Sequence, residues 1–308
     1  MCDDDFEKET AAYLSRRDVL GAGAAAAAML VGCTQPGSAA APTATATATA
    51  DPGAGDTGEP PARATTNRRV TIKTPDGEAE AFFVAPADGA HPGVVMWPDV
   101  AGLREAYETM ATRLAGAGYA VLAVNQYYRS TKLPVLTSFA EWRTEEGKAK
   151  ITPMREAITP EGIAKDGAAF AAWLDQQKEV DPKKKLASTG YCMGGPFTFY
   201  TAAAVPERFG VVASFHGGGL VTDAETSPHK LLAKTKVAAL ICIAQNDDEK
   251  QPEAKTTLSE AAAAAERVAE IEVYPAQHGF CTIDSPVYDK VQAERAWSRM
   301  LAMFERHL

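Results

Sequence analysis

Apolar and polar positions change their period several times along residues 68–308. Short apolar runs predict strands, and longer runs in which apolar residues recur every three or four positions predict helices. The predicted strands are 69–73, 79–85, 93–97, 120–125, 185–190, 211–215, 238–244 and 269–274. The predicted helices are 106–117, 162–177, 196–204, 253–266 and 288–306. Because strands and helices alternate, we expect an α/β fold with a mostly parallel, eight-stranded sheet and helices on both faces.

Residues 127–161 interrupt this alternation. They show no sustained period of either kind, so we expect them to form an irregular segment. Long connections at the carboxyl edge of a sheet commonly shape a binding pocket. We therefore expect a substrate pocket beside this segment.

Paired arginines precede an apolar run near the start of the chain. Arg16 and Arg17 stand just before residues 19–31, which is the order of a twin-arginine export signal. That run has 13 residues, fewer than the roughly 20 of a membrane-spanning helix. Cys33 follows Leu-Val-Gly, as the lipidated cysteine of a bacterial lipoprotein does. The alternative is an unmodified Cys33 ahead of an ordinary signal-peptidase site at 39–41.

We therefore expect residues 1–33 to be an export signal and the protein to be lipid-anchored in the cell envelope, in the periplasm or on the outer face of the membrane. Residues 34–67 consist largely of Ala, Thr, Pro, Gly and Ser. Such a composition buries too little apolar area to offset the entropy of ordering. We expect a disordered tether over 34–67, which makes the lipid the only membrane contact, and one domain over 68–308.

Charge and composition exclude several classes of partner. The net charge of −9 is against binding of polyanions, and the lysines at 183–185 are typical of a solvated turn. The glycines at 217–219 lack the spacing of a phosphate-binding loop. The five Cys and five His contain no C-x-x-C or H-x-x-x-H pair, which are common metal-binding spacings. We therefore expect no nucleic-acid partner, no metal ion and no cofactor.

A G-x-C-x-G pentapeptide at 190–194 stands between a predicted strand and a predicted helix. This is the setting of a nucleophile elbow, a strained turn that needs neighbours without Cβ where strand and helix crowd together. The commoner motif has Ser at its centre, and here the central residue is Cys192. The N-terminus of the following helix favours a thiolate there. Cys192 is the candidate nucleophile, whereas Cys242, inside a predicted strand, is expected in the core.

Two polar residues downstream, Asp247 and His278, each follow an apolar strand-like run. The carboxyl ends of parallel strands lie at one edge of a sheet, so Cys192, Asp247 and His278 can converge there. Nucleophile, acid and histidine follow one another in the α/β-hydrolase order. In such a triad the imidazole carries the proton and the carboxylate orients the imidazole. Asp248 is the alternative acid, because a shift of one residue in the loop exchanges the two carboxylates.

Two further side chains lie near the same edge. His216 ends the predicted strand 211–215, and it either lines the pocket or caps the strand. Cys281 follows His278 by three residues. Because cysteine is among the most buried residue types, we expect Cys281 to pack rather than to react.

The motifs around Cys192 (190–195), Asp247 (246–248) and His278 (278–280), together with the run 96–103, make residues 68–308 resemble the dienelactone hydrolase family. The resemblance implies an α/β-hydrolase fold. It also implies cleavage of an ester or lactone, in the manner of a carboxymethylenebutenolidase.

The resemblance further implies roles for individual residues. Asp99 occupies the place of an acidic residue, usually Glu, that contacts the resting thiol and moves away when substrate binds, so it is the expected thiol switch. Arg129 stands where the family has an Arg that helps to hold the substrate carboxylate. The position of a second such Arg, four residues after the histidine, is Thr282 here. This departure is consistent with a different ester, lactone or thioester substrate.

We therefore expect a hydrolase that acts on a small-molecule ester or lactone. Cys192 attacks the carbonyl, and the backbone N–H groups of Met193 and Val100 hold the oxyanion. The alternative is a non-catalytic surface lipoprotein that uses the same fold to bind a ligand or partner after its thiol is oxidised. The presence of both Asp247 and His278 favours the enzyme, since a binding pocket has no need of them.

Overall fold

The computed structural model of the protein describes residues 62–308. The expected export signal over 1–33, with Cys33, and the expected tether up to residue 61 lie outside the described residues. Within residues 62–308, no helix is both long enough and apolar enough to cross a bilayer.

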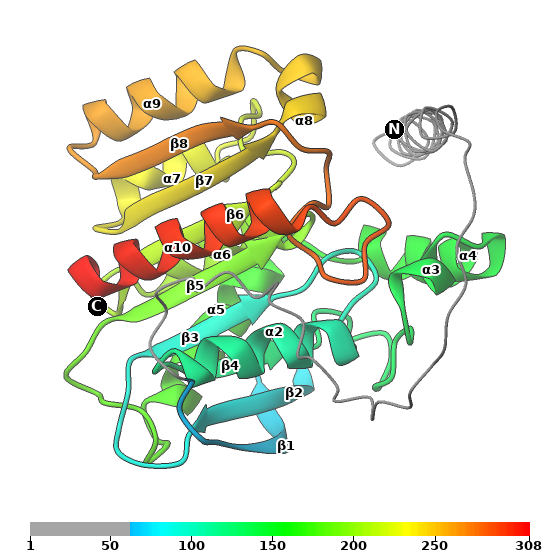
Figure 1. Cartoon of the computed structure of the whole chain (residues 1–308), viewed down its shortest axis with the longest axis vertical. Helices are drawn as coiled ribbons and strands as arrows, with labels where there is room; N and C mark the ends of the chain where they lie inside the picture. Colours follow the sequence, from blue (N-terminus) through cyan, green and yellow to red (C-terminus); the bar gives the residue numbers. More distant parts are fainter. Residues whose placement is uncertain (1–61) are drawn as a thin grey trace, which may run out of the picture. The chain divides into compact units, whose positions relative to one another are not determined.

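Eight strands form one sheet, in the spatial order β1-β2-β4-β3-β5-β6-β7-β8 (Figure 1). They are β1 (Thr65–Thr74), β2 (Gly77–Pro86), β3 (Gly93–Trp97), β4 (Ala120–Val124), β5 (Leu186–Tyr191), β6 (Phe209–Phe215), β7 (Ala238–Ala244) and β8 (Ala269–Tyr274). β2 is antiparallel to both of its neighbours, and every other pair is parallel. The strands β3, β4, β5, β6 and β7 are buried along their whole length, as their mostly apolar sequences allow. The expected eight-stranded, mostly parallel sheet is confirmed.

Helices cover both faces of this sheet (Figure 1). They are α2 (Glu105–Gly116), α3 (Phe139–Trp142), α4 (Glu145–Glu156), α5 (Pro160–Leu174), α6 (Gly194–Ala204), α7 (Pro228–Leu231), α8 (Gln245–Lys250), α9 (Ala254–Ala264) and α10 (Lys290–His307), with a 3-10 turn at Leu232–Lys234. One buried cluster joins the sheet to α5, α6 and α9 through Phe170, Phe197 and Leu258. A second cluster joins the opposite face to α2 and α10 through Leu114 and Phe304.

The short helices α7 and α8 were not expected from the sequence, and two longer segments also differ from the expectation. β1 begins at Thr65 and pairs with β2 from there, so residues 65–67 belong to the sheet and not to the tether. Residues 127–161 are not an irregular segment, because they contain α3 and α4. Thr144 caps α4, since its hydroxyl accepts the N–H of Gly147, and the helix buries only three of its residues, one of them a glycine. So little apolar surface leaves no helical period in the sequence, and the cap was the signal that could have revealed the helix.

Candidate active site

A sharp turn joins β5 to α6 and carries Cys192. Cys192 has a φ of 53°, in the left-handed region that residues with a Cβ rarely adopt. A Cβ on Gly190 would lie 1.9 Å from the carbonyl oxygen of Gly194, and a Cβ on Gly194 would lie 2.5 Å from that of Trp97. Close approach of backbone therefore requires both glycines, as a nucleophile elbow demands.

His278 and Asp247 meet at the same edge of the sheet, from the segments that follow β8 and β7. Nδ1 of His278 lies 2.7 Å from Oδ2 of Asp247. Oδ1 of Asn246, a buried residue, accepts the backbone N–H of His278 at 2.8 Å. Asp248, the alternative acid, instead accepts hydrogen bonds from Nζ of Lys255 at 2.6 and 2.8 Å. Of the two carboxylates, Asp247 is the one that contacts the imidazole.

The imidazole of His278 also forms a hydrogen bond with Cys192. Burial lowers the pKa of His278, but the charges of Asp247 and Cys192 outweigh burial and hold this pKa well above its usual 6.5. The arrangement therefore favours an imidazolium between the Asp247 carboxylate and the Cys192 sulfur. Such a pair supplies a nucleophile and a proton donor at one place.

Two backbone N–H groups near this turn have no hydrogen-bond partner among residues 62–308. One belongs to Met193, directly after Cys192, and the other to Val100, in the segment after β3. The two segments are in contact, because a Cβ on Gly194 would lie 2.5 and 2.7 Å from the carbonyl oxygens of Trp97 and Pro98. Two free N–H groups on adjoining segments are the parts from which an oxyanion hole is built.

His216 packs directly against His278 and is completely buried. The two ring centroids lie 5.1 Å apart in an edge-to-face arrangement. Neither ring nitrogen of His216 has a partner among the described residues. Burial, together with the charge of His278, holds the pKa of His216 well below 6.5. His216 is therefore a neutral support for the His278 ring.

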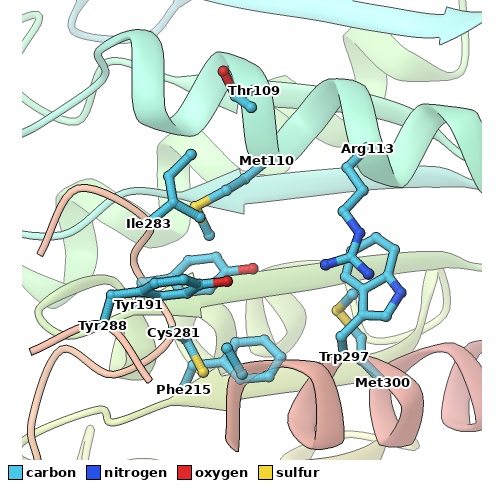
Figure 2. Close-up of a pocket in the computed structure, with 11 residues that line it drawn as sticks. Thr109, Met110, Arg113, Tyr191, Phe215, Cys281, Ile283, Tyr288, Trp297 and Met300 are labelled. Atoms are coloured by element: carbon cyan, nitrogen blue, oxygen red, sulfur yellow. The ribbon is translucent and has the colours of Figure 1, made fainter. Parts of the chain in front are cut away.

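A cavity of about 90 Å³ lies between α2 and α10, against the ends of β5 and β6 (Figure 2). It is lined by Tyr191, Cys281, Trp297 and other mostly apolar side chains, and not by Cys192, Asp247 or His278. Burial raises the pKa of the Cys281 thiol well above its usual value. Cys192 thus does not line this cavity, whereas Cys281 packs in its wall.

Metal ligation is a second use to which His, Cys and carboxylate side chains can be put. Among residues 62–308, no three of them gather in a group that could hold a metal ion. His278 and Asp247 instead form a hydrogen bond with each other.

The candidate site lies within the residues that one protein-family model matches. The model of the dienelactone hydrolase family matches residues 79–308, a range that contains Val100, Cys192, Asp247 and His278. The chain belongs to the dienelactone hydrolase family.

Curated relatives are similar to this domain in both length and sequence. A Salmonella typhi protein with the provisional name carboxymethylenebutenolidase is 28% identical over 245 residues, which cover 77% of this chain and 86% of that protein. A Synechocystis protein of the same provisional name is 26% identical over 244 residues, covering 78% of this chain and 96% of that protein.

Solved structures of other dienelactone hydrolase-like proteins have the same fold. The crystal structure of a provisionally named dienelactone hydrolase from Klebsiella pneumoniae superposes with a TM-score of 0.68 at 24% identity, covering 80% of this chain and all of that one. A dienelactone hydrolase-like promiscuous phosphotriesterase from metagenomic libraries superposes with a TM-score of 0.64 at 22% identity, covering 79% of this chain and 99% of that one. At these identities the likeness concerns the fold.

In this member of the family, Asp99 contacts an arginine in place of Cys192. Its Oδ1 and Oδ2 accept hydrogen bonds from Nη1 and Nη2 of Arg104 at 2.7 and 2.9 Å, and Oδ1 also accepts the N–H of Ala101 at 2.9 Å. The thiol contact expected of a switch at Asp99 is therefore not the one that the structure shows. The physical reason is that Arg104 lies in the same turn and neutralises the carboxylate where water is excluded.

Arg129, expected at the substrate carboxylate, is held by two carboxylates of the chain itself. Nη1 and Nη2 donate to Asp166 at 2.7 and 2.8 Å, and Nη2 also donates to Asp76 at 2.8 Å. The Asp166 side chain is completely buried. Because both carboxylates already balance the guanidinium, these contacts do not favour a role for Arg129 in substrate binding. Thr282 is buried, and its hydroxyl faces that of Tyr107 at 3.4 Å.

Sequence reasoning missed four buried or half-buried residues around the site: Asn246, Gln126, Arg104 and Asp284. Asn246 and Gln126 carried a usable signal, because each is a polar residue just past the carboxyl end of a strand. Arg104 and Asp284 carried none, since they stand 180 residues apart and their pairing depends on how the loops pack.

Proposed function

We propose that this family member is a hydrolase that cleaves an ester or lactone bond through Cys192, Asp247 and His278. The observation that carries the proposal is the continuous chain of contacts from the Asp247 carboxylate through the His278 imidazole to the sulfur of Cys192, held on a strained turn. A residue that merely packs has no need of a left-handed backbone, an imidazolium and an orienting carboxylate.

The first half of the proposed reaction forms a thioester. The thiolate of Cys192 attacks the carbonyl carbon, and the N–H groups of Met193 and Val100 donate hydrogen bonds to the carbonyl oxygen, on which negative charge develops. As the tetrahedral intermediate collapses, the bond to the leaving oxygen breaks and the His278 imidazolium gives its proton to that oxygen. Asp247 keeps Nδ1 of His278 protonated, so Nε2 is the atom that exchanges protons with the reactants.

The second half returns the enzyme to its starting state. His278, now neutral, takes a proton from water, and the resulting hydroxide attacks the thioester carbon. The same two N–H groups stabilise the second oxyanion. Collapse of this intermediate breaks the carbon–sulfur bond, releases the acid and restores the pair of thiolate and imidazolium.

The charges around the site bear on the choice of substrate. Arg129 is neutralised by Asp166 and Asp76, and position 282 holds a threonine instead of an arginine. Neither therefore offers an unpaired positive charge to an anionic group. We propose that the substrate is an ester, lactone or thioester without a carboxylate beside the bond that is cleaved.

We also propose export by the twin-arginine route and lipid anchoring through Cys33 in the cell envelope. The support is the order of Arg16, Arg17, the apolar run and Cys33 in the sequence. The lipid would hold the hydrolase at a membrane surface without a spanning helix.

Hydrolysis of a short-chain chromogenic ester by the reduced protein tests the proposed activity. We expect turnover by the wild type, none after treatment with iodoacetamide and none for Cys192→Ala, with an unchanged melting temperature for that variant. Cys281→Ala is the matched control, because this thiol is buried at the cavity between α2 and α10. It should keep its activity. Equal activity of Cys192→Ala and wild type would refute the proposal, and absence of activity in all forms would favour a binding protein.

A further inference from the structure

The peptide that joins Asp99 to Val100 is held from one side by a buried glutamine. Nε2 of Gln126 donates to the carbonyl oxygen of Asp99 at 2.7 Å. Gln126 is 2% exposed and lies two residues past the end of β4. The same carbonyl accepts the N–H of Gly102 at 3.0 Å, so this oxygen has two donors.

Fixing that carbonyl also fixes the N–H on the other side of the peptide. In a planar trans peptide the C=O of Asp99 and the N–H of Val100 point in opposite directions. The Val100 N–H is the one that has no partner among residues 62–308. A donor on the carbonyl also polarises the peptide and makes its N–H a stronger donor. Gln126 is therefore placed to aim and strengthen one arm of the proposed oxyanion hole.

The next peptide, between Val100 and Ala101, provides an internal comparison. The carbonyl oxygen of Val100 accepts the hydroxyl of Tyr127 at 2.8 Å, and the N–H of this second peptide, that of Ala101, donates to Oδ1 of Asp99 at 2.9 Å. Both peptides are thus held by side chains from the segment after β4. Only the first presents a free N–H.

Stability alone does not account for a glutamine at position 126. Its Oε1 is buried without a hydrogen-bond partner among the described residues, and an unmatched buried acceptor costs free energy of folding. An apolar side chain of similar size would avoid that cost but would leave the Asp99 carbonyl without one of its two donors. The Nε2 donor is what the glutamine contributes.

We propose that Gln126 is a positioning residue for transition-state stabilisation, acting through the Val100 N–H. The inference rests on the proposed hydrolase function. It predicts that loss of the Nε2 donor lowers kcat while KM changes little, because the oxyanion exists only after the nucleophile has attacked.

The test compares Gln126→Leu with Tyr127→Phe in hydrolysis of the chromogenic ester. Each variant removes a short, buried hydrogen bond from the same turn. Gln126→Leu also removes the unmatched Oε1, so it should lose no more thermal stability than Tyr127→Phe. For Gln126→Leu we expect kcat to fall about tenfold, less than the roughly 10²–10³-fold loss caused by removing an oxyanion donor itself. For Tyr127→Phe we expect a loss of less than about threefold, because its peptide carries no free N–H and its 3.7 Å contact with Met193 is to the side-chain sulfur and not to the backbone N–H.

Alkylation of Cys192 by iodoacetamide separates this role from general disorder of the site. Alkylation needs the thiolate beside His278 but develops no oxyanion, so its rate in Gln126→Leu should match that of the wild type. Gln126→Glu provides a second readout. Its carboxyl donates only when protonated, so its kcat relative to the wild type should rise as the pH falls, while the ratio for Gln126→Leu stays flat.

Two results would overturn the inference without touching the proposed function. One is an active wild type with equal losses of kcat in Gln126→Leu and Tyr127→Phe, and the other is a fall in alkylation that parallels the fall in hydrolysis. An inactive wild type, or a Cys192→Ala variant as active as the wild type, would refute the proposed function and this inference with it.

Discussion

Asp99 and Arg104 form a bidentate ion pair in which both side chains are only 1% exposed. Arg104 reaches on to Asp284, with Nε and Nη2 each 2.7 Å from a carboxylate oxygen. Burial lowers the pKa of Arg104, but the two carboxylates outweigh burial and hold this pKa above its usual range. Asp284 also accepts the N–H of Phe139, at the start of α3. One guanidinium thus connects the turn that carries Val100, the segment after His278 and the helical segment at α3.

Arg104→Met should destabilise the protein strongly. It leaves the Asp99 carboxylate buried without its partner, and loss of one member of a buried pair costs about 3–5 kcal/mol. Unfolding in urea, followed by circular dichroism, measures the effect. The control is Lys236→Met, which removes an exposed ion pair with Glu207 and should leave the free energy of unfolding nearly unchanged. Equal unfolding curves for both variants would contradict the stabilising role of Arg104.

Conversion of each candidate acid to Asn distinguishes Asp247 from Asp248. Asp247→Asn should lower kcat by about 10⁴, since an amide at this place favours the wrong imidazole tautomer. Asp248→Asn should have a small effect, because Asp248 pairs with Lys255 and not with His278. Steady-state kinetics on the chromogenic ester decides between them. A large loss at Asp248 alone would move the acid by one residue, and no loss at either would leave Cys192 and His278 as a dyad.

The protonation of His278 should depend on Asp247. Burial lowers the pKa of His278 and the charges of Asp247 and Cys192 raise it further than burial lowers it, so the ring should stay protonated above pH 6.5 in the wild type. In Asp247→Asn this pKa should fall. NMR spectra of histidine-labelled protein can follow the five imidazoles. His216, whose pKa burial holds well below 6.5, should remain neutral throughout and serve as the internal reference.

The raised pKa of His278 also makes the stability of the protein depend on pH. A pKa raised on folding contributes stability that is fully present below the unfolded-state value of about 6.5 and is lost as the pH rises through the folded-state value. The stability gap between wild type and Asp247→Asn should therefore be largest below pH 6.5 and should shrink at alkaline pH. Melting temperatures across that range measure it. A gap that widened with rising pH would contradict the charge assignment of His278.

Cell fractionation tests the proposed route to the envelope. Replacement of both Arg16 and Arg17 by Lys should leave the precursor in the cytoplasm, since the paired arginines are the element that the export route reads. Cys33→Ser should release the protein from the membrane fraction, because no lipid can then be attached. Firm membrane association of Cys33→Ser would rule out lipid anchoring at Cys33.

Much of the fold follows from local pattern. The runs at 93–97 and 238–244 are apolar from end to end, and β3 and β7 have those bounds. The short, regular alternation of buried strands with amphipathic helices is enough to predict a parallel sheet, because few other arrangements bury such strands on both faces. α4 could not be found in this way, since its buried positions are few and its sequence is mostly polar.

The residues proposed for catalysis could also be predicted from the sequence. The glycines around Cys192 mark a backbone that a Cβ would obstruct, and strand order brings Asp247 and His278 to the same edge. The charged partners of Asp99 and Arg129 could not be predicted from the sequence. A carboxylate or guanidinium pairs with whichever opposite charge the packing brings close. For Arg129 one such charge is that of Asp166, which lies 37 residues away in the sequence, in α5. Periodicity and strand order are properties of the chain, whereas the choice among many possible charge partners is made only when loops from distant segments pack together and exclude water.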